Sequence, residues 1–229
     1  MKIKILSWNI WMDSDFGKVT EFLRSSNADI VAVQEYMPDD SGRDIVAFLT
    51  KLGYHSAVSS SWEIRKDGRK MGVALFSKYP ICRTSTVVLS EDKRRLAVEA
   101  DIEVGEALLK VFSVHTLHTH LQESDILNGQ VEHLIKALPE EKVVVMGDFN
   151  ATPDMTTIVR MRKVLVDTDP TLAPTWSLNP KGCEGCVFSG LTIKLDYIFA
   201  SRDLKTHSFK VETDAKGSDH LPVSVVVEI

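Results

Sequence analysis

The chain has 229 residues, of which 44% are hydrophobic and 26% are charged, and its formal net charge is −5. This composition is ordinary for a soluble globular protein, and the length suits one domain spanning residues 1–229. No run approaches the roughly 20 apolar residues that a membrane span needs. Because the first residues also lack the apolar segment of a signal peptide, we expect a cytoplasmic monomer without stable membrane association.

Apolar patterning predicts a strand-rich chain with helices interspersed in both halves. The strands expected in chain order are 3–9, 29–35, 54–59, 71–77, 84–89, 95–103, 107–115, 142–148, 193–199, 205–213 and 221–229. Apolar residues at helical spacing predict helices that end before Asn27, Gly53 and Pro139. The stretch 164–192 is interrupted by Pro, Gly and Cys residues, and we interpret it as a long functional loop.

Three cysteines, an odd number, argue against a disulfide framework. Cys183 and Cys186 have the spacing of half a zinc knuckle, but a closed zinc site needs four ligands and the only other cysteine is Cys82. A pair of free thiols in a loop is the favoured interpretation, with a metal or redox role as the alternative.

Polar side chains stand at or near the ends of six apolar runs. Residues two apart on a strand point to the same face, so Asp148 and Asn150 could converge on one ligand. Ligands of sheet proteins commonly collect at strand ends. The sequence therefore predicts one polar cluster at the rim of a sheet core, formed by Asn9, Glu35, His115, Asp148, Asn150, Asp196, Asp219 and His220.

The same residues resemble the endonuclease/exonuclease/phosphatase superfamily. The matching segments follow one another in the family's order over nearly the whole chain: Trp8-Asn9, Gln34-Glu35, His115, Gly147-Asp148-Phe149-Asn150, Leu195-Asp196-Tyr197-Ile198 and Ser218-Asp219-His220-Leu221-Pro222. The resemblance implies a metal-dependent phosphoesterase. It also implies an α/β fold of the α+β type, in which two packed, mostly antiparallel sheets are flanked by helices in a four-layer sandwich.

Carboxylate and amide oxygens suit a hard cation such as Mg²⁺, with Mn²⁺ as a possible substitute. Asn9 and Glu35 are the predicted ligands, and Asp219 adds to them. The resemblance assigns metal ligands to the same three positions. Trp11 stands where some relatives carry a further acid, which favours a one-metal arrangement.

Around that cation, Asp148 is predicted to orient or deprotonate the attacking water, and Asn150 to hold the water or a phosphate oxygen. His115 and His220 are expected to donate to the phosphate, and a cationic imidazole would stabilise the transition state. Asp196 is expected to fix the tautomer of His220. His118 and His120 stay open as alternatives to His115, which is favoured because an apolar strand delivers it directly.

Nucleic acid, DNA first, is the expected substrate despite the acidic net charge. Cationic runs at 65–70 and 93–95 could contact phosphates, and Trp62 could stack on a base. The predicted substrate-binding residues are Trp62, Arg69, Lys70, Trp176 and Asn179. A phosphoesterase acting on phospholipid headgroups or inositol phosphates is the alternative, with residues 170–190 as its apolar loop, and a non-catalytic binding module is the remote one.

Overall fold

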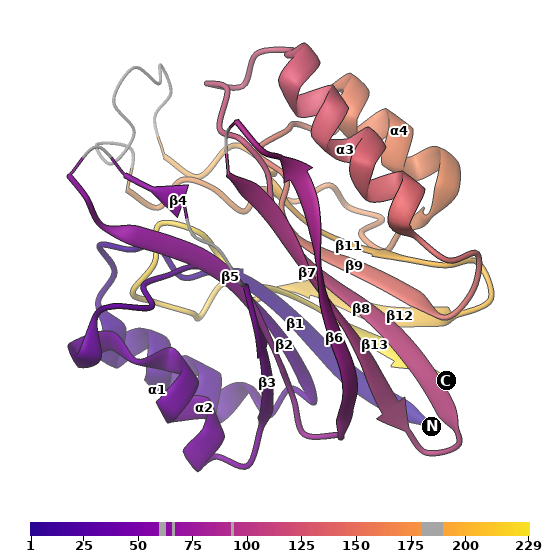
Figure 1. Cartoon of the computed structure of the whole chain (residues 1–229), viewed down its shortest axis with the longest axis horizontal. Coiled ribbons are helices and arrows are strands. Elements are labelled where there is room, and N and C mark those ends of the chain that lie inside the picture. The colour runs from indigo at the N-terminus through magenta and orange to yellow at the C-terminus, as the bar shows by residue number, and fades with distance from the viewer. Residues whose placement is uncertain (60–62, 66, 93, 180–189) are drawn as a thin grey trace.

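Two β-sheets packed face to face form the centre of the molecule, and helices cover the outer face of each sheet (Figure 1). The computed structural model describes residues 1–59, 63–65, 67–92, 94–179 and 190–229. The predicted four-layer α/β sandwich is confirmed. No helix among these residues is long and apolar enough to cross a membrane.

The first sheet has the strand order β12-β13-β1-β2-β5-β3, with β4 paired to β5. Its strands are β1 (Lys2–Asn9), β2 (Ile30–Tyr36), β3 (His55–Val58), β4 (Glu63–Ile64), β5 (Lys70–Ser77), β12 (Lys205–Val211) and β13 (Val223–Glu228). Only β1 and β2 are paired in parallel among the described strands of this sheet.

The second sheet has the order β10-β11-β9-β8-β7-β6. Its strands are β6 (Ile81–Ser90), β7 (Arg95–Val104), β8 (Ala107–His115), β9 (Val143–Asp148), β10 (Val166–Asp167) and β11 (Asp196–Ala200). Only β8 and β9 run parallel among its described strands. The expectation of mostly antiparallel sheets is therefore confirmed.

The first sheet is covered by α1 (Phe16–Ser26) and α2 (Ile45–Lys51), with the short 3₁₀ turn η1 (Ser41–Arg43) between them. The second sheet is covered by α3 (Asp125–Ala137) and α4 (Thr156–Val164). Helix α4 was not predicted. Its β-branched residues weaken helix propensity, and it is stabilised by burying Ile158 and Met161 against the sheet.

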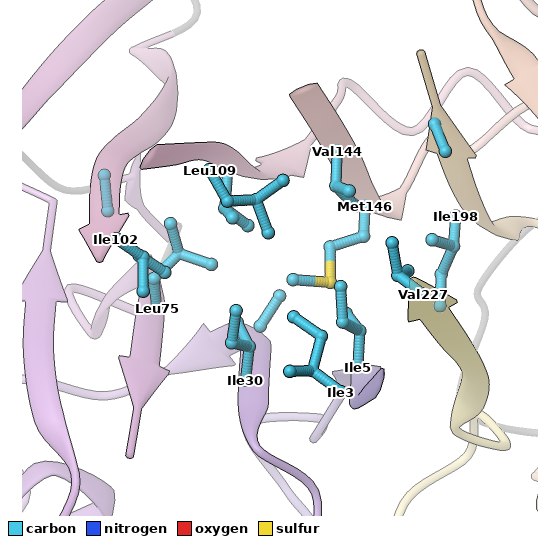
Figure 2. Packing of buried hydrophobic residues seen from close by; sticks show 14 of the residues in the cluster. Ile3, Ile5, Ile30, Leu75, Ile102, Leu109, Val144, Met146, Ile198 and Val227 are labelled. Atoms are coloured by element: carbon cyan, nitrogen blue, oxygen red, sulfur yellow. The ribbon is translucent and has the colours of Figure 1, made fainter. Parts of the chain in front are cut away.

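The inter-sheet core explains why the chemistry lies at one end of the sandwich. Alternate residues of each strand point between the sheets, and over most of their length they are apolar, as the labelled side chains of Figure 2 show. The next inward layer is polar, where Gln34 Nε2 lies 3.4 Å from Ser7 Oγ and 3.2 Å from Ser113 Oγ. At the same edge, the inward positions that end β1, β8 and β9 and begin β11 are Asn9, His115, Asp148 and Asp196.

Candidate functional site

Asp148, the last residue of β9, lies at the centre of the polar cluster. Its side chain is 1% exposed, and its two oxygens are held separately. Oδ1 accepts a hydrogen bond from the amide of Asn150 (2.8 Å), and Oδ2 accepts one from Asn9 Nδ2 (3.0 Å). Burial is the main cause that raises the pKa of this carboxyl, and Asp196 adds to it while His220 opposes it. A carboxylate with a raised pKa is suited to accept a proton.

Asn9 and Glu35 come together because parallel strands β1 and β2 end at the same edge. Asn9 Nδ2 also donates to Glu35 Oε1 at 3.0 Å, and Asn9 Oδ1 accepts from the amide of Trp11 at 3.0 Å. Glu35 has a φ of +59° and lies in a register shift between β2 and β5. Such a bulge re-aims a side chain, and here Glu35 joins the cluster although its neighbour Gln34 occupies the regular inward position.

His220 and Asp196 form a buried pair, with 2.8 Å between His220 Nδ1 and Asp196 Oδ2. His220 Nε2 faces Asp148 Oδ2 at 3.7 Å. Burial alone lowers the pKa of His220, but the carboxylates of Asp196, Asp148 and Asp219 outweigh it, so the net pKa is raised. The ring is therefore an imidazolium near neutral pH.

Asp219 precedes this histidine and is braced by a tryptophan. Trp176 Nε1 donates to Asp219 Oδ2 at 3.0 Å, while the buried Oδ1 has no hydrogen-bond partner among the described residues. Trp176 is only 4% exposed, and its ring packs 5.9 Å from that of His220. Trp176 therefore orients Asp219 in the structure. Its contact with a substrate stays a prediction.

His115, at the end of β8, faces the same carboxylates from the other side. Its Nε2 atom lies 3.6 Å from Asp148 Oδ2 and 3.7 Å from Glu35 Oε1. Behind it, Arg95 Nη1 lies 3.1 Å from His115 Nδ1 and 2.7 Å from Glu63 Oε2. Burial, and then the charge of Arg95, lowers the pKa of His115.

Arg95 and Glu63 are members of this cluster that the sequence did not place in it. Arg95 closes the cationic run 93–95, which was expected as a possible phosphate contact, but its side chain is buried, with 6% exposed. Its surroundings are created by the pairing of β4 with β5, and a two-residue strand leaves no periodic signal in the sequence.

Asn150 and His118 lie next to Asp148 at the rim. Asn150 has a φ of +46°, a region that Asn tolerates better than most residues. Its Nδ2 donates to the carbonyl of Thr116 at 3.0 Å, and its Oδ1 lies 2.8 Å from His118 Nδ1. His115 is thus directed at Asp148, and His118 contacts Asn150. The roles predicted for these residues in a reaction stay predictions.

The donor chemistry of the cluster fits a hard divalent cation. Five buried or mostly buried carboxylates belong to it: Glu35, Glu63, Asp148, Asp196 and Asp219. His220 and Arg95 supply compensating positive charge, but Arg95 is already paired with Glu63, as is Arg65 at 3.8 Å. Burial raises the pKa of Asp219, and the charge of Glu35 adds to this effect. The surplus negative charge and the unpaired Asp219 Oδ1 are what a cation would satisfy.

A second arrangement of possible ligands is weaker. Ligand atoms of Asp148, Asp196 and His220 lie within 4.8 Å of one another. A cation there would replace the 2.8 Å hydrogen bond between Asp196 and His220 and would meet an imidazolium. The oxygen-rich end of the cluster, at Asn9, Glu35 and Asp219, is better suited to bind a hard divalent cation.

Three of the predicted substrate-binding residues, Arg69, Lys70 and Asn179, have partners that do not belong to this cluster. Arg69 is exposed and forms ion pairs with Asp13 (2.5 Å) and Asp67 (2.8 Å). Lys70 lies 3.0 Å from Asp39. Asn179 is half-buried, and its amide donates to Ser177 Oγ at 3.0 Å. Trp62, Cys183 and Cys186 lie outside the described residues, and all the substrate contacts stay predictions.

Comparison with known proteins identifies the family of this arrangement. The family model described as Endonuclease/Exonuclease/phosphatase family matches residues 6–220. Among curated proteins, no sequence matches the chain significantly.

Solved structures share the fold. An endonuclease/exonuclease/phosphatase from Beutenbergia cavernae superposes with a TM-score of 0.81 at 18% identity, covering 100% of this chain and 72% of that one. An endonuclease/exonuclease/phosphatase from Bacteroides vulgatus superposes with a TM-score of 0.75 at 20% identity, covering 100% of this chain and 99% of that one. ANGEL2, a 2′,3′-cyclic phosphatase, superposes with a TM-score of 0.72 at 16% identity, covering 99% of this chain and 95% of that one.

Proposed function

The chain belongs to the Endonuclease/Exonuclease/phosphatase family, whose members are metal-dependent hydrolases of phosphoester bonds, and we propose that this member cleaves nucleic-acid phosphodiesters with Mg²⁺. The observation that carries the proposal is the position of Asp148. One of its oxygens faces His115, His220 and Asn9 together, and burial has raised the pKa of this carboxyl.

The residues that would hold the cation are Asn9, Glu35 and Asp219. When bound, Mg²⁺ neutralises phosphate oxygens and lowers the pKa of water near it. Trp176 contributes by holding one oxygen of Asp219 and leaving the other available. Mn²⁺ is the expected substitute, and Zn²⁺ is disfavoured because it prefers nitrogen and sulfur ligands.

Asp148 accepts the proton of the attacking water at Oδ2, while Asn9 and the Asn150 amide hold the carboxylate in place. The water oxygen bonds to phosphorus as the bond to the leaving oxygen breaks. The Nε2–H of the His220 imidazolium donates to a phosphoryl oxygen and stabilises the charge that develops there. Asn150 retains one N–H that is not used by Thr116 and is available for the water or the phosphate.

Support for a nucleic-acid substrate comes from the surroundings of the cluster. Arg69 is exposed at the edge of the 63–70 hairpin, where a phosphate could replace one of its two acidic partners. Proteins of the same fold act on related chemistry, since ANGEL2 is described as a 2′,3′-cyclic phosphatase and was solved with adenosine-2′,3′-vanadate. One observation favours the phospholipid or inositol phosphate alternative: Leu172 and Leu178 are 47% and 43% exposed.

The test is Mg²⁺-dependent turnover of a panel of single- and double-stranded DNA, RNA, 2′,3′-cyclic nucleotides, phospholipids and inositol phosphates. Turnover of a nucleic acid is expected, with loss in EDTA and recovery on adding Mg²⁺ or Mn²⁺. Turnover of phospholipids or inositol phosphates alone would overturn the proposed nucleic-acid substrate. Full activity in chelator would overturn the proposed dependence on a metal. A second measurement needs no substrate: Mg²⁺ should raise the melting temperature of the wild type, and Asp219→Asn should remove most of that rise.

A further inference from the structure

The two histidines that face Asp148 each have a partner at Nδ1, and one partner accepts a hydrogen bond whereas the other donates one. Behind His220, the Asp196 carboxylate lies 2.8 Å from Nδ1 and can only accept a hydrogen bond. Behind His115, the guanidinium of Arg95 lies 3.1 Å from Nδ1 and can only donate. The ring nitrogens that face Asp148 Oδ2 are the Nε2 atoms in both cases, at 3.6 Å for His115 and 3.7 Å for His220.

The donor behind His115 decides where its proton sits. Because Arg95 donates to Nδ1, that nitrogen must carry a lone pair, and the single proton of a neutral ring is then on Nε2. Adding a second proton would place it on Nδ1, directly against the guanidinium. His115 is thereby limited to donating from Nε2, and it has no free lone pair with which to accept the proton of a water.

Arg95 is in turn fixed by Glu63. The Glu63 Oε2 atom lies 2.7 Å from the same Nη1 atom that contacts His115. Arg95 is 6% exposed, and its side chain and that of Glu63 line a cavity of about 20 Å³, which has room for a single water. Glu63 comes from β4, which pairs with β5 in the first sheet, whereas Arg95 begins β7 of the second sheet. The contact thus links β4 of one sheet to the histidine of the other.

We propose that Glu63 and Arg95 are positioning residues that hold His115 as a neutral donor with its proton on Nε2. The two histidines then differ in their partners at Nδ1, a carboxylate for His220 and a guanidinium for His115, and His115 cannot compete with Asp148 for the proton of the water. This inference goes beyond the proposed function, and only its kinetic test rests on that function.

The direct test is the tautomer of His115, measured by long-range ¹H–¹⁵N correlation spectra of the full chain labelled with ¹⁵N-histidine. His115→Gln assigns the resonances by their loss. We expect Nδ1 of His115 to have the shift of an unprotonated nitrogen and Nε2 that of a protonated one, with and without Mg²⁺. A proton on Nδ1, or an even mixture of the two tautomers, would overturn the proposal.

The role of Glu63 is tested by Glu63→Gln, which keeps the shape of the side chain and removes its charge. Arg95 should then lose its fixed position, and the His115 spectrum should change from one tautomer to a mixture. The matched control is Glu132→Gln, which removes the charge of an exposed ion pair between Glu132 on α3 and Arg160 on α4. It should leave the His115 resonances unchanged. An unchanged His115 spectrum in folded Glu63→Gln would overturn the role of Glu63.

The kinetic test uses the substrate identified by the panel. Glu63→Gln should lower kcat by about 10- to 100-fold, the usual loss when a group that orients a site residue from behind is removed. KM should change much less, and Arg95→Lys should recover part of the loss seen in Arg95→Met, because a lysine also only donates. Equal losses for these two variants, or an unchanged kcat in Glu63→Gln, would overturn the proposal. If no phosphoester is turned over, the proposed function fails, while the spectra still decide the tautomer.

Discussion

Asp196 and His220 face each other across the junction of the two sheets, with 2.8 Å between Asp196 Oδ2 and His220 Nδ1. Asp196 begins β11 of the second sheet, and His220 precedes β13 of the first. Their pairing therefore depends on the packing of the whole sandwich. Trp8, whose Nε1 donates to the carbonyl of His220 at 2.9 Å, holds the histidine segment from the other side.

The first prediction is that these two residues act as one unit in catalysis. His220→Ala should lower turnover by about 10²-fold or more, as expected for loss of a donor to the developing charge. Asp196→Ala should cost less, and the double variant should be little worse than His220→Ala, because groups that act together are non-additive. A double-mutant cycle on turnover measures this. If the fold-losses in turnover of the two single variants multiplied in the double variant, the pairing would be contradicted. Thermal melts of the variants distinguish a loss of turnover from a loss of folding.

The second prediction concerns pH and stability. The surrounding carboxylates raise the pKa of His220 above the value of about 6.5 expected in the unfolded chain. The stabilisation from protonated His220 is then fully present below about pH 6.5 and is lost as the pH rises through the raised pKa. The difference in melting temperature between the wild type and His220→Gln, measured without metal, should therefore be largest near pH 6. A gap that widens toward alkaline pH would contradict the raised pKa.

Much of the fold and of this cluster could be predicted because each depends on local pattern. Apolar runs mark the strands, and a polar residue at the end of each run marks the edge where they meet. His115 could be favoured over His118 because the strand 107–115 ends on it, and β8 has those bounds. Asp196 was expected to orient His220, and the two are hydrogen bonded.

What could not be predicted depends on contacts between distant segments. Arg95 and Glu63 are 32 positions apart and meet only because a short hairpin of the first sheet lies over the start of β7. The bracing of Asp219 by Trp176 likewise depends on antiparallel bridges from Trp176 to the distant residues Ile193 and His220. Neither arrangement is visible in the composition of the segments themselves.

The third prediction is that Asp148→Asn lowers turnover by at least about 10²-fold, the low end for loss of a general base. The amide keeps the shape of the side chain and can still accept one of the two hydrogen bonds from Asn9 and Asn150, so melting should change by only a few degrees. Asp203→Asn is the matched control, since Asp203 is exposed and accepts hydrogen bonds from the amide of Lys142. Retained turnover in folded Asp148→Asn would show that another group accepts the proton.

The last prediction tests how closely β8 and β9 must approach to bring His115 beside Asp148. The two residues are register partners, and Gly147 is paired with Val114 one position earlier. A Cβ atom added at Gly147 would lie 1.9 Å from the carbonyl oxygen of Val114, so Gly147→Ala must push the strands apart. We expect a loss of about 1–3 kcal/mol, as for other overpacked cores, or more because the obstacle is backbone. For a chain of this size, that corresponds to a melting temperature lower by about 2–12 °C.

Turnover of Gly147→Ala should also fall at temperatures where the protein is fully folded, because displacement of β9 carries Asp148 with it. The matched control is Gly129→Ala in α3, where an added Cβ meets nothing within 4 Å. Alanine is favoured over glycine in a helix by roughly 1 kcal/mol, so this variant should melt at or slightly above the wild-type temperature with unchanged turnover. Differential scanning calorimetry and turnover at 25 °C would check both variants. If Gly147→Ala matched the control in both measurements, strand spacing would not be what places Asp148 against His115.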